Sequence, residues 1–238
     1  MQRVIYFTIC MLLLLPMAVM PVGAGEVLDR VVATVNNKPI FQSDWDGAIC
    51  FEAFMQQKPF AQITERDRVT ALQRIIDRQL LKAQMGDASY LQPPTEALER
   101  DLAKLRSQVP GGDDDQKWGK LLASYGLTEE VVKDHLRTET QVMNFVEVRL
   151  RPAVRVQPED VEAYYRDQLL PDLRKVGGKN VSLSDAEPKI RELLTQQRMD
   201  ELLDAWLHNL RQQAEIRTSV PIPAINTDSD QSKASGAD

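Results

Sequence analysis

The sequence predicts a mostly helical protein that carries a small β-sheet. The helix-favouring residues Leu, Gln, Arg, Glu and Ala are plentiful among the 238 residues, whereas aromatic residues make up only 6%. Apolar residues recur at helical spacing through most of the chain, and the convincing strand patterns are residues 30–41 and 215–220. Because these two segments stand at opposite ends of the patterned region, pairing them would close a single domain.

The N-terminal residues 1–24 have the pattern of a secretory signal peptide. An apolar run from Val4 to Met20 follows a positive charge, and small residues, Val22 to Ala24, precede the expected cleavage point. The alternative is a transmembrane anchor, which needs roughly 20 unbroken apolar residues. This run is shorter and contains Pro16. We therefore expect export to the periplasm by a cleaved signal, and no stable membrane anchor after cleavage.

Charge and cysteine content narrow the class of protein further. Asp and Glu total 35 against 29 Lys and Arg, a formal net charge of -6. No basic excess is available to bind nucleic acid or to hold the chain on anionic lipid. Cys10 leaves with the signal, so Cys50 cannot form an internal disulfide in the exported chain. We interpret Cys50 as a buried apolar thiol rather than a nucleophile.

The first folded elements are a hairpin and a helix. Residues 28–40 contain an apolar strand, an Asn36-Asn37 pair and a second short strand. Asn tolerates the positive φ of a tight turn, so the pair predicts the hairpin bend. Ser43, with acidic residues after it, predicts the N-cap of the helix that follows.

Further helices are predicted between capping or proline starts and glycine or proline stops. Thr64 with Asp67 forms a capping box, and Thr128 caps a helix whose apolar stripe includes Val132, Met143 and Val146. The expected spans are residues 64–86, 93–109, 113–125, 128–150 and 158–169.

A long closing helix is predicted over residues 185–214. Ser184 to Glu187 resembles a capping box, and Pro188 is still within the expected first turn. The alternating residues 215–220 predict a strand directly after the helix. Residues 221–238 are small, polar and unpatterned, which predicts a disordered tail.

The residues that carry most enzyme chemistry lack a recognisable arrangement. His135 and His208 have no partner at zinc-ligand spacing, and each is better interpreted as a structural or solvated histidine. Asp113 to Asp115 is interpreted as an acidic first helical turn rather than a metal site. The chain also has no nucleophile elbow, phosphate loop or dinucleotide fingerprint. We therefore expect no catalytic, metal-binding or cofactor-binding residues.

Several segments, taken in order, resemble the SurA-type periplasmic chaperones, a group that includes PrsA-like foldases. Residues 26–50, EVLDRVVATVNNKPIFQSDWDGAIC, contain the D-x-V-x-x-x-V-N strand and the S-D pair of that family's opening. Residues 69–83, VTALQRIIDRQLLKA, are similar to its second helix. Residues 128–165 and 190–217 are similar to its later helices and its closing strand.

The resemblance implies a SurA-like helical chaperone domain over residues 25–220, in which the N-terminal hairpin pairs with the strand after the closing helix. Full-length relatives carry parvulin-type prolyl isomerase domains before the closing helix. A domain of that kind needs about 90 residues, whereas Leu170 to Lys189 provides 20. The resemblance therefore implies a periplasmic chaperone for unfolded outer-membrane or secreted polypeptides, without isomerase activity.

Client binding of this kind needs flexible apolar side chains on the surface. The candidate peptide-binding residues are Phe51, Phe54, Met55, Phe60, Trp118, Tyr125 and Met143. Each could instead be ordinary core, and Trp206 is expected to be core. Phe54 and Phe60 are predicted to be the most exposed, because residues 54–60 approach a loop at Lys58-Pro59.

Two alternatives to the general chaperone stay open at this point. The first is a dedicated accessory subunit of one envelope or secretion system. The second is a residual peptidyl-prolyl isomerase. The sequence selects neither a particular client nor an oligomeric state.

Overall fold

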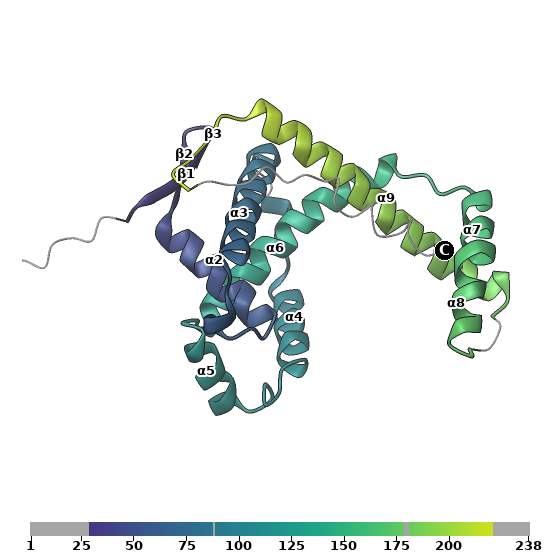
Figure 1. The fold of residues 1–238 in the computed structure, drawn as a ribbon, viewed down its shortest axis with the longest axis horizontal. Coiled ribbons are helices and arrows are strands. Elements are labelled where there is room, and N and C mark those ends of the chain that lie inside the picture. The colour runs from purple at the N-terminus through teal and green to yellow at the C-terminus, as the bar shows by residue number, and fades with distance from the viewer. Residues whose placement is uncertain (1–28, 88, 179–180, 221–238) are drawn as a thin grey trace, which may run out of the picture.

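The computed structural model describes residues 29–87, 89–178 and 181–220 (Figure 1). These residues form helices and a three-stranded antiparallel sheet, which confirms the predicted fold class. The predicted signal peptide and the predicted C-terminal tail lie outside the described residues. The elements are β1 Val31–Val35, β2 Lys38–Phe41, α2 Gln42–Met55, η1 Phe60–Gln62, α3 Glu65–Met85, η2 Ser89–Leu91, α4 Thr95–Ser107, α5 Asp115–Ser124, α6 Glu129–Leu150, η3 Arg151–Ala153, α7 Pro158–Tyr164, η4 Tyr165–Leu169, α8 Leu170–Lys175, α9 Leu183–Gln213 and β3 Ile216–Thr218.

The sheet has the order β2-β1-β3, so the N-terminal hairpin pairs with the strand after the closing helix, as predicted. Asn36 and Asn37 have φ values of 48° and 65°, the positive φ that a tight two-residue hairpin turn requires. On the other edge of β1, Thr34 stands opposite Arg217, and the N–H of Ser219 donates to the carbonyl of Val32 at 2.9 Å. The last strand is shorter than the predicted range 215–220.

Two predicted helix caps are wrong by two residues. Helix α2 begins at Gln42, and the carboxylate of Asp44 accepts the N–H of Phe41 at 2.9 Å. The hydroxyl of Ser43, the predicted N-cap, donates instead to the carboxylate of Asp29.

The start of α9 shows the same kind of shift. Ser182 caps this helix and accepts the N–H of Asp185 at 3.2 Å, so Ser184 is already inside it. Pro188 therefore lies beyond the first turn. In α9 a second serine two positions away was available, whereas α2 begins after Phe41 with no side-chain cap. The exact start of each helix depends on where the incoming chain turns.

The main core lies where the sheet meets α2, α3, α6 and α9. Its most completely buried side chains include Val32 and Val35 of β1, Ile40 of β2 and Leu72 of α3. Trp206 of α9 packs half-buried against this core, which agrees with its predicted place. Its ring centroid lies 5.8 Å from that of Phe145 on α6.

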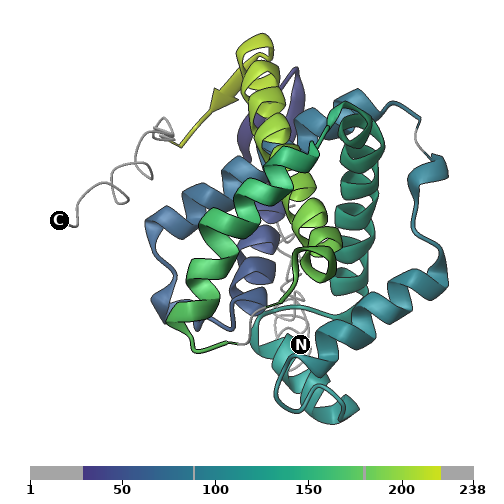
Figure 2. The ribbon, with the colours of Figure 1, turned by 90° about the vertical axis from the view of Figure 1, so that its right-hand side faces the viewer.

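Helices α7 and α8 form a smaller lobe at the end of α9 far from the sheet (Figures 1 and 2). The segment between them, Tyr165–Leu169, is a π-helix. Pro171 has no N–H to donate to the carbonyl of Asp167, and the wider π turn accommodates that lost bond. The lobe has its own small core around Val161, Ala186 and Ile190. Helix α9 therefore joins two separate cores.

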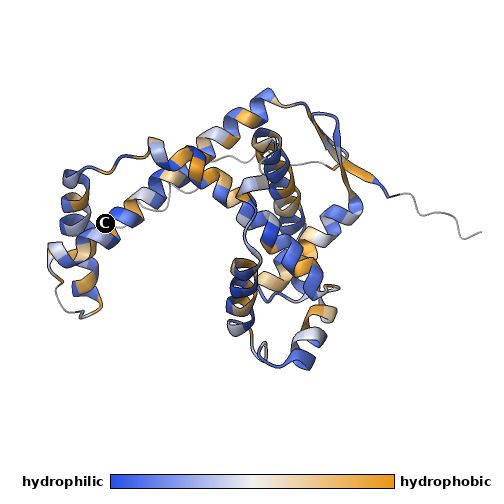
Figure 3. Ribbon diagram, turned by 180° about the vertical axis from the view of Figure 1, so that it is seen from behind, coloured by the Kyte–Doolittle hydropathy of each residue, from blue (hydrophilic) through white to orange (hydrophobic). Residues whose placement is uncertain are grey.

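Figure 3 shows that the helices carry both apolar and hydrophilic residues. Among the described residues, no helix is long and apolar enough to cross a membrane.

Candidate peptide-binding site

Five of the seven predicted binding residues meet in one aromatic cluster, formed by Phe51, Phe54, Phe60, Trp118 and Tyr125. The Phe54 ring is central, with edge-to-face contacts to Trp118 and Tyr125 at centroid distances of 5.7 and 5.8 Å. Phe51 and Phe60 extend the cluster on either side, at 6.5 Å from Phe54 and 5.6 Å from Tyr125. The aromatic cluster thus brings together residues of α2, η1, α5 and the turn after α5.

Most of this cluster is core rather than surface. Phe51, Phe54 and Trp118 expose only 6%, 1% and 3% of their surfaces. The prediction that Phe54 is among the most exposed candidates is wrong. Helix α2 continues to Met55, so Phe54 is still on its inward face, and the chain leaves the helix only at Gln56.

Three members of the predicted set remain accessible where the chain leaves α2 and α5. Phe60 is 45% exposed, as predicted, and Met55 is 46% exposed. Tyr125 is half-buried between the Phe54 and Phe60 rings. We call Met55, Phe60 and Tyr125 the aromatic rim. Two of its members are supported by rings, because Phe60 contacts Tyr125 and Tyr125 contacts the buried Phe54, so this apolar surface can keep its shape.

Met143 lies apart from this group on α6 and is 49% exposed. The prediction placed Met143 on the inward stripe of its helix. The structure places Val142 and Val146 there instead, with exposures of 8% and 1%. Successive helix positions are about 100° apart, so positions 142 and 143 lie on opposite sides of position 146, and the packing of α6 buries the first of them.

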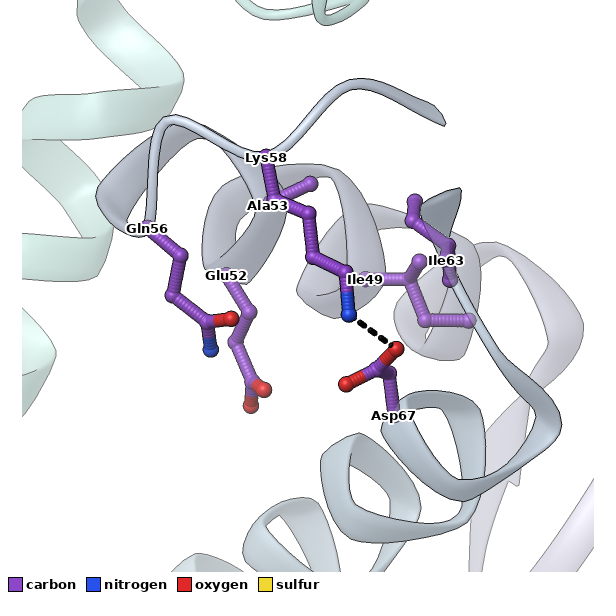
Figure 4. A pocket seen from close by; sticks show the side chains of 7 residues that line it. All are labelled: Ile49, Glu52, Ala53, Gln56, Lys58, Ile63 and Asp67. Carbon is purple, nitrogen blue, oxygen red and sulfur yellow. Dashed lines mark hydrogen bonds and ion pairs between the residues drawn. The ribbon is translucent and has the colours of Figure 1, made fainter. Parts of the chain in front are cut away.

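The loop that carries Phe60 is fastened to the start of α3. The ammonium of Lys58 lies 2.5 Å from a carboxylate oxygen of Asp67 (Figure 4). That carboxylate also accepts the N–H of Thr64 at 2.7 Å, which confirms the predicted capping box. The hydrogen bonds from Lys58 and Thr64 lower the pKa of Asp67. The space beneath, lined by Ile49 and Ile63, has a volume of about 10 Å³, so it is packing rather than a ligand site.

Trp118 is held by a polar network on its outer side. Its indole N–H donates to Glu129 at 2.9 Å, and the guanidinium of Arg106 lies 5.4 Å from the ring centroid. Arg106 also donates to Asp115 at 2.5 Å. These partners satisfy the one polar atom of a buried indole and fix α5 against α4 and α6.

The remaining polar candidates have structural surroundings. His135 stacks on Phe51 at a centroid distance of 4.4 Å, and a ring nitrogen of His208 is 2.9 Å from the Gln212 amide. Cys50 is half-buried beside the aromatic cluster, and burial raises the pKa of its thiol. Within residues 29–87, 89–178 and 181–220, no three His, Cys, Asp or Glu side chains are grouped to hold a metal ion.

Comparison with known proteins identifies the family. The SurA-like N-terminal domain family matches residues 1–145, more than half of the chain. The matched range includes the hairpin and the whole aromatic cluster, while α9 and β3 follow it. No curated protein matches the chain. The chain therefore belongs to the SurA-like N-terminal domain family, whose members are typically periplasmic and whose domain is a chaperone module for polypeptide clients.

Proposed function

We propose that this protein is a periplasmic chaperone that holds unfolded outer-membrane or secreted polypeptides and has no prolyl isomerase activity. In this proposal residues 1–24 direct export and are then removed. The observation that carries the proposal is the aromatic rim, in which Met55 and Phe60 are exposed and Phe60 packs on Tyr125, which in turn contacts the buried Phe54. Family membership supports the same conclusion.

Binding at the rim needs no catalytic group. Aromatic and thioether side chains offer large apolar contact area, and Met adapts its shape to different partners. An extended client segment would place its apolar side chains on the rim and leave its polar groups in water. The net charge of -6 favours solubility of the loaded complex.

The test is suppression of aggregation during refolding of a urea-unfolded outer-membrane barrel, followed by light scattering. The full chain should suppress scattering, and the double variant Met55→Ser with Phe60→Ser should lose most of that effect while keeping its helical circular dichroism. Tyr90→Ser is the matched control, because Tyr90 is 75% exposed but lies on η2, outside the rim. Equal suppression by the rim variant and the control would contradict the proposal.

Two further measurements address the alternatives. In a proline-peptide isomerisation assay, the rate with the protein should equal the uncatalysed rate. In a pull-down from an envelope extract, a general chaperone should return many outer-membrane chains, whereas a dedicated accessory subunit should return one.

A further inference from the structure

A second surface feature lies on the other side of the aromatic cluster. It is a groove of about 330 Å³ between β2, α2, α3 and α6. We call it the basic groove. Its lining residues are Pro39, Ile40, Ser43, Asp44, Gly47, Ala48, Ile75, Arg78, Gln79, Lys82 and His135. This volume falls within the range of small-molecule and peptide side-chain sites.

Two cations in this groove have no anionic partner among the described residues. Arg78 and Lys82 lie one turn apart on α3 and so repel each other. In the part of the chain that the structure describes, no carboxylate lies within ion-pair distance of either side chain, whereas Arg74 on the same helix pairs with Glu52 and Arg211 of α9 pairs with Asp77. Partial burial, together with the nearby charge of Arg78, lowers the pKa of Lys82. An arrangement of this kind costs stability, and a bound anion would relieve it.

The acidic neighbours offset only part of that positive charge. Asp44 is the carboxylate among the lining residues, and it accepts the N–H of Phe41. Ser43 donates its hydroxyl to Asp29, so it is turned toward that carboxylate. The lining of the groove therefore carries two cations and one carboxylate, in a protein whose net charge is -6.

One of the residues that line the groove is a glycine, Gly47. Gly47 lies inside α2, where glycine is less favourable than alanine. A Cβ at this position would meet no atom within 4 Å, so packing inside the protein does not require glycine there. Because Gly47 is one of the lining residues, a larger side chain at this position would occupy part of the groove.

We propose that the basic groove binds the C-terminal carboxylate of an unfolded client, with the client's last apolar side chain against Pro39 and Ile75, the apolar lining residues that are not buried. Arg78 and Lys82 would donate charge-assisted hydrogen bonds to the carboxylate, the strongest kind that these groups make. The groove adjoins the aromatic cluster, because His135 in its lining stacks on Phe51. This inference rests on the proposed chaperone function and adds a preference for chain ends.

Fluorescence anisotropy with a labelled peptide ending in Phe tests the inference on the full chain. The peptide with a free C-terminal carboxylate should bind about tenfold more tightly than the same peptide with a C-terminal amide. In the double variant Arg78→Gln with Lys82→Gln, the two peptides should bind equally. Arg66→Gln is the matched control, because it removes a cation from the exposed first turn of the same helix and should leave the preference unchanged.

A second variant gives an independent readout without removing charge. Gly47→Met should weaken binding of the free-acid peptide while leaving the free energy of unfolding unchanged or higher. Equal affinity of the acid and amide peptides for the unaltered chain would overturn the inference and leave the proposed chaperone function intact. A preference that survives in the Arg78/Lys82 variant would also overturn it. If neither peptide binds and no aggregation is suppressed, the proposed function and this inference fail together.

Discussion

Asp77 on α3 and Arg211 on α9 form a two-pronged ion pair, with Nε–Oδ1 and Nη2–Oδ2 distances of 2.7 and 2.5 Å. The pair joins helices 134 residues apart in the sequence. Burial nevertheless raises the pKa of Asp77 in spite of the nearby guanidinium. The cost of removing the carboxylate from water therefore offsets much of the attraction, and the main effect of the pair is to fix the angle of α9.

A double-mutant cycle on this pair should give a coupling energy of about 1 to 2 kcal/mol, since both partners are partly buried and the geometry is bidentate. The variants are Asp77→Asn, Arg211→Gln and their combination, measured by urea unfolding. Arg217 with Glu215 is the control pair, because both side chains are largely exposed. Its coupling should stay below about 0.5 kcal/mol. Equal coupling for the two pairs would contradict this interpretation.

Phe54→Ala and Phe60→Ala should differ in how much they lower the free energy of unfolding. Phe54 is fully buried between three other rings, so its truncation should lower the free energy of unfolding by about 3 to 5 kcal/mol. Phe60 is nearly half exposed, and its truncation should cost about 1 kcal/mol or less. Urea unfolding gives both values. A larger loss for Phe60 than for Phe54 would show that the cluster is not packed as described.

The sequence singled out all five residues of the aromatic cluster as candidates for peptide binding, but it did not show which of them reach the surface. Phe54 and Met55 are neighbours on the same helix, yet one is 1% and the other 46% exposed. A turn of 100° between successive residues decides that difference, and it depends on the angle at which α2 packs on α5. The spacing of Trp118 and Tyr125 from Phe54 in the sequence carries no information on that angle.

The turn residues Asn36 and Asn37 offer a matched pair of substitutions to glycine. Both have positive φ, so glycine should fit either position without strain. The Asn36 side chain also accepts the N–H of Glu215 at 2.9 Å. Asn36→Gly should therefore lower the free energy of unfolding by about 1 kcal/mol, and Asn37→Gly should leave it nearly unchanged. Equal losses would mean that the contact with Glu215 adds nothing to stability.

The lowered pKa of Asp67 predicts a loss of stability in acid. Because the folded-state pKa lies below the ordinary value of 3.8, the contribution of Asp67 is complete above that value and is lost as the pH falls through the folded-state pKa. The melting temperature of Asp67→Asn should be lower than that of the unaltered chain near neutral pH. The difference should shrink as the pH falls below about 4. A difference that does not change with pH would show that the ionised carboxylate is not the stabilising form.

Gly47→Ala should stabilise the protein, by up to about 1 kcal/mol, because alanine favours the helix and the added Cβ has open space. Gly86→Ala is the control with the opposite sign. Gly86 caps α3 with a φ of 58°, a conformation that alanine adopts only with strain. Thermal unfolding measures both variants. Destabilisation by Gly47→Ala would mean that α2 needs glycine for its own packing.

Sequence rules for turns and helix caps predicted the structure correctly where a segment offered a single candidate residue or pair. The Asn36-Asn37 turn and the Thr64–Asp67 capping box both formed as predicted. The rules missed the cap of α9, where Ser182 and Ser184 compete, because the incoming chain decides which hydroxyl meets a free N–H. They also missed the basic groove, since no pattern along the chain shows that Arg78 and Lys82 have no ion-pair partner within the described part of the structure.

The sheet constrains the order in which the parts of this protein fold. Asn36 and Glu215 are hydrogen-bonded but lie 179 residues apart, so β1 cannot pair with β3 until all the helices between them have been synthesised. Contacts that close so long a loop form late in folding. Until then the outer edge of β1 presents unpaired N–H and C=O groups, a surface on which extended chains aggregate. The newly made protein thus passes through a stage in which it exposes a strand edge that itself needs protection.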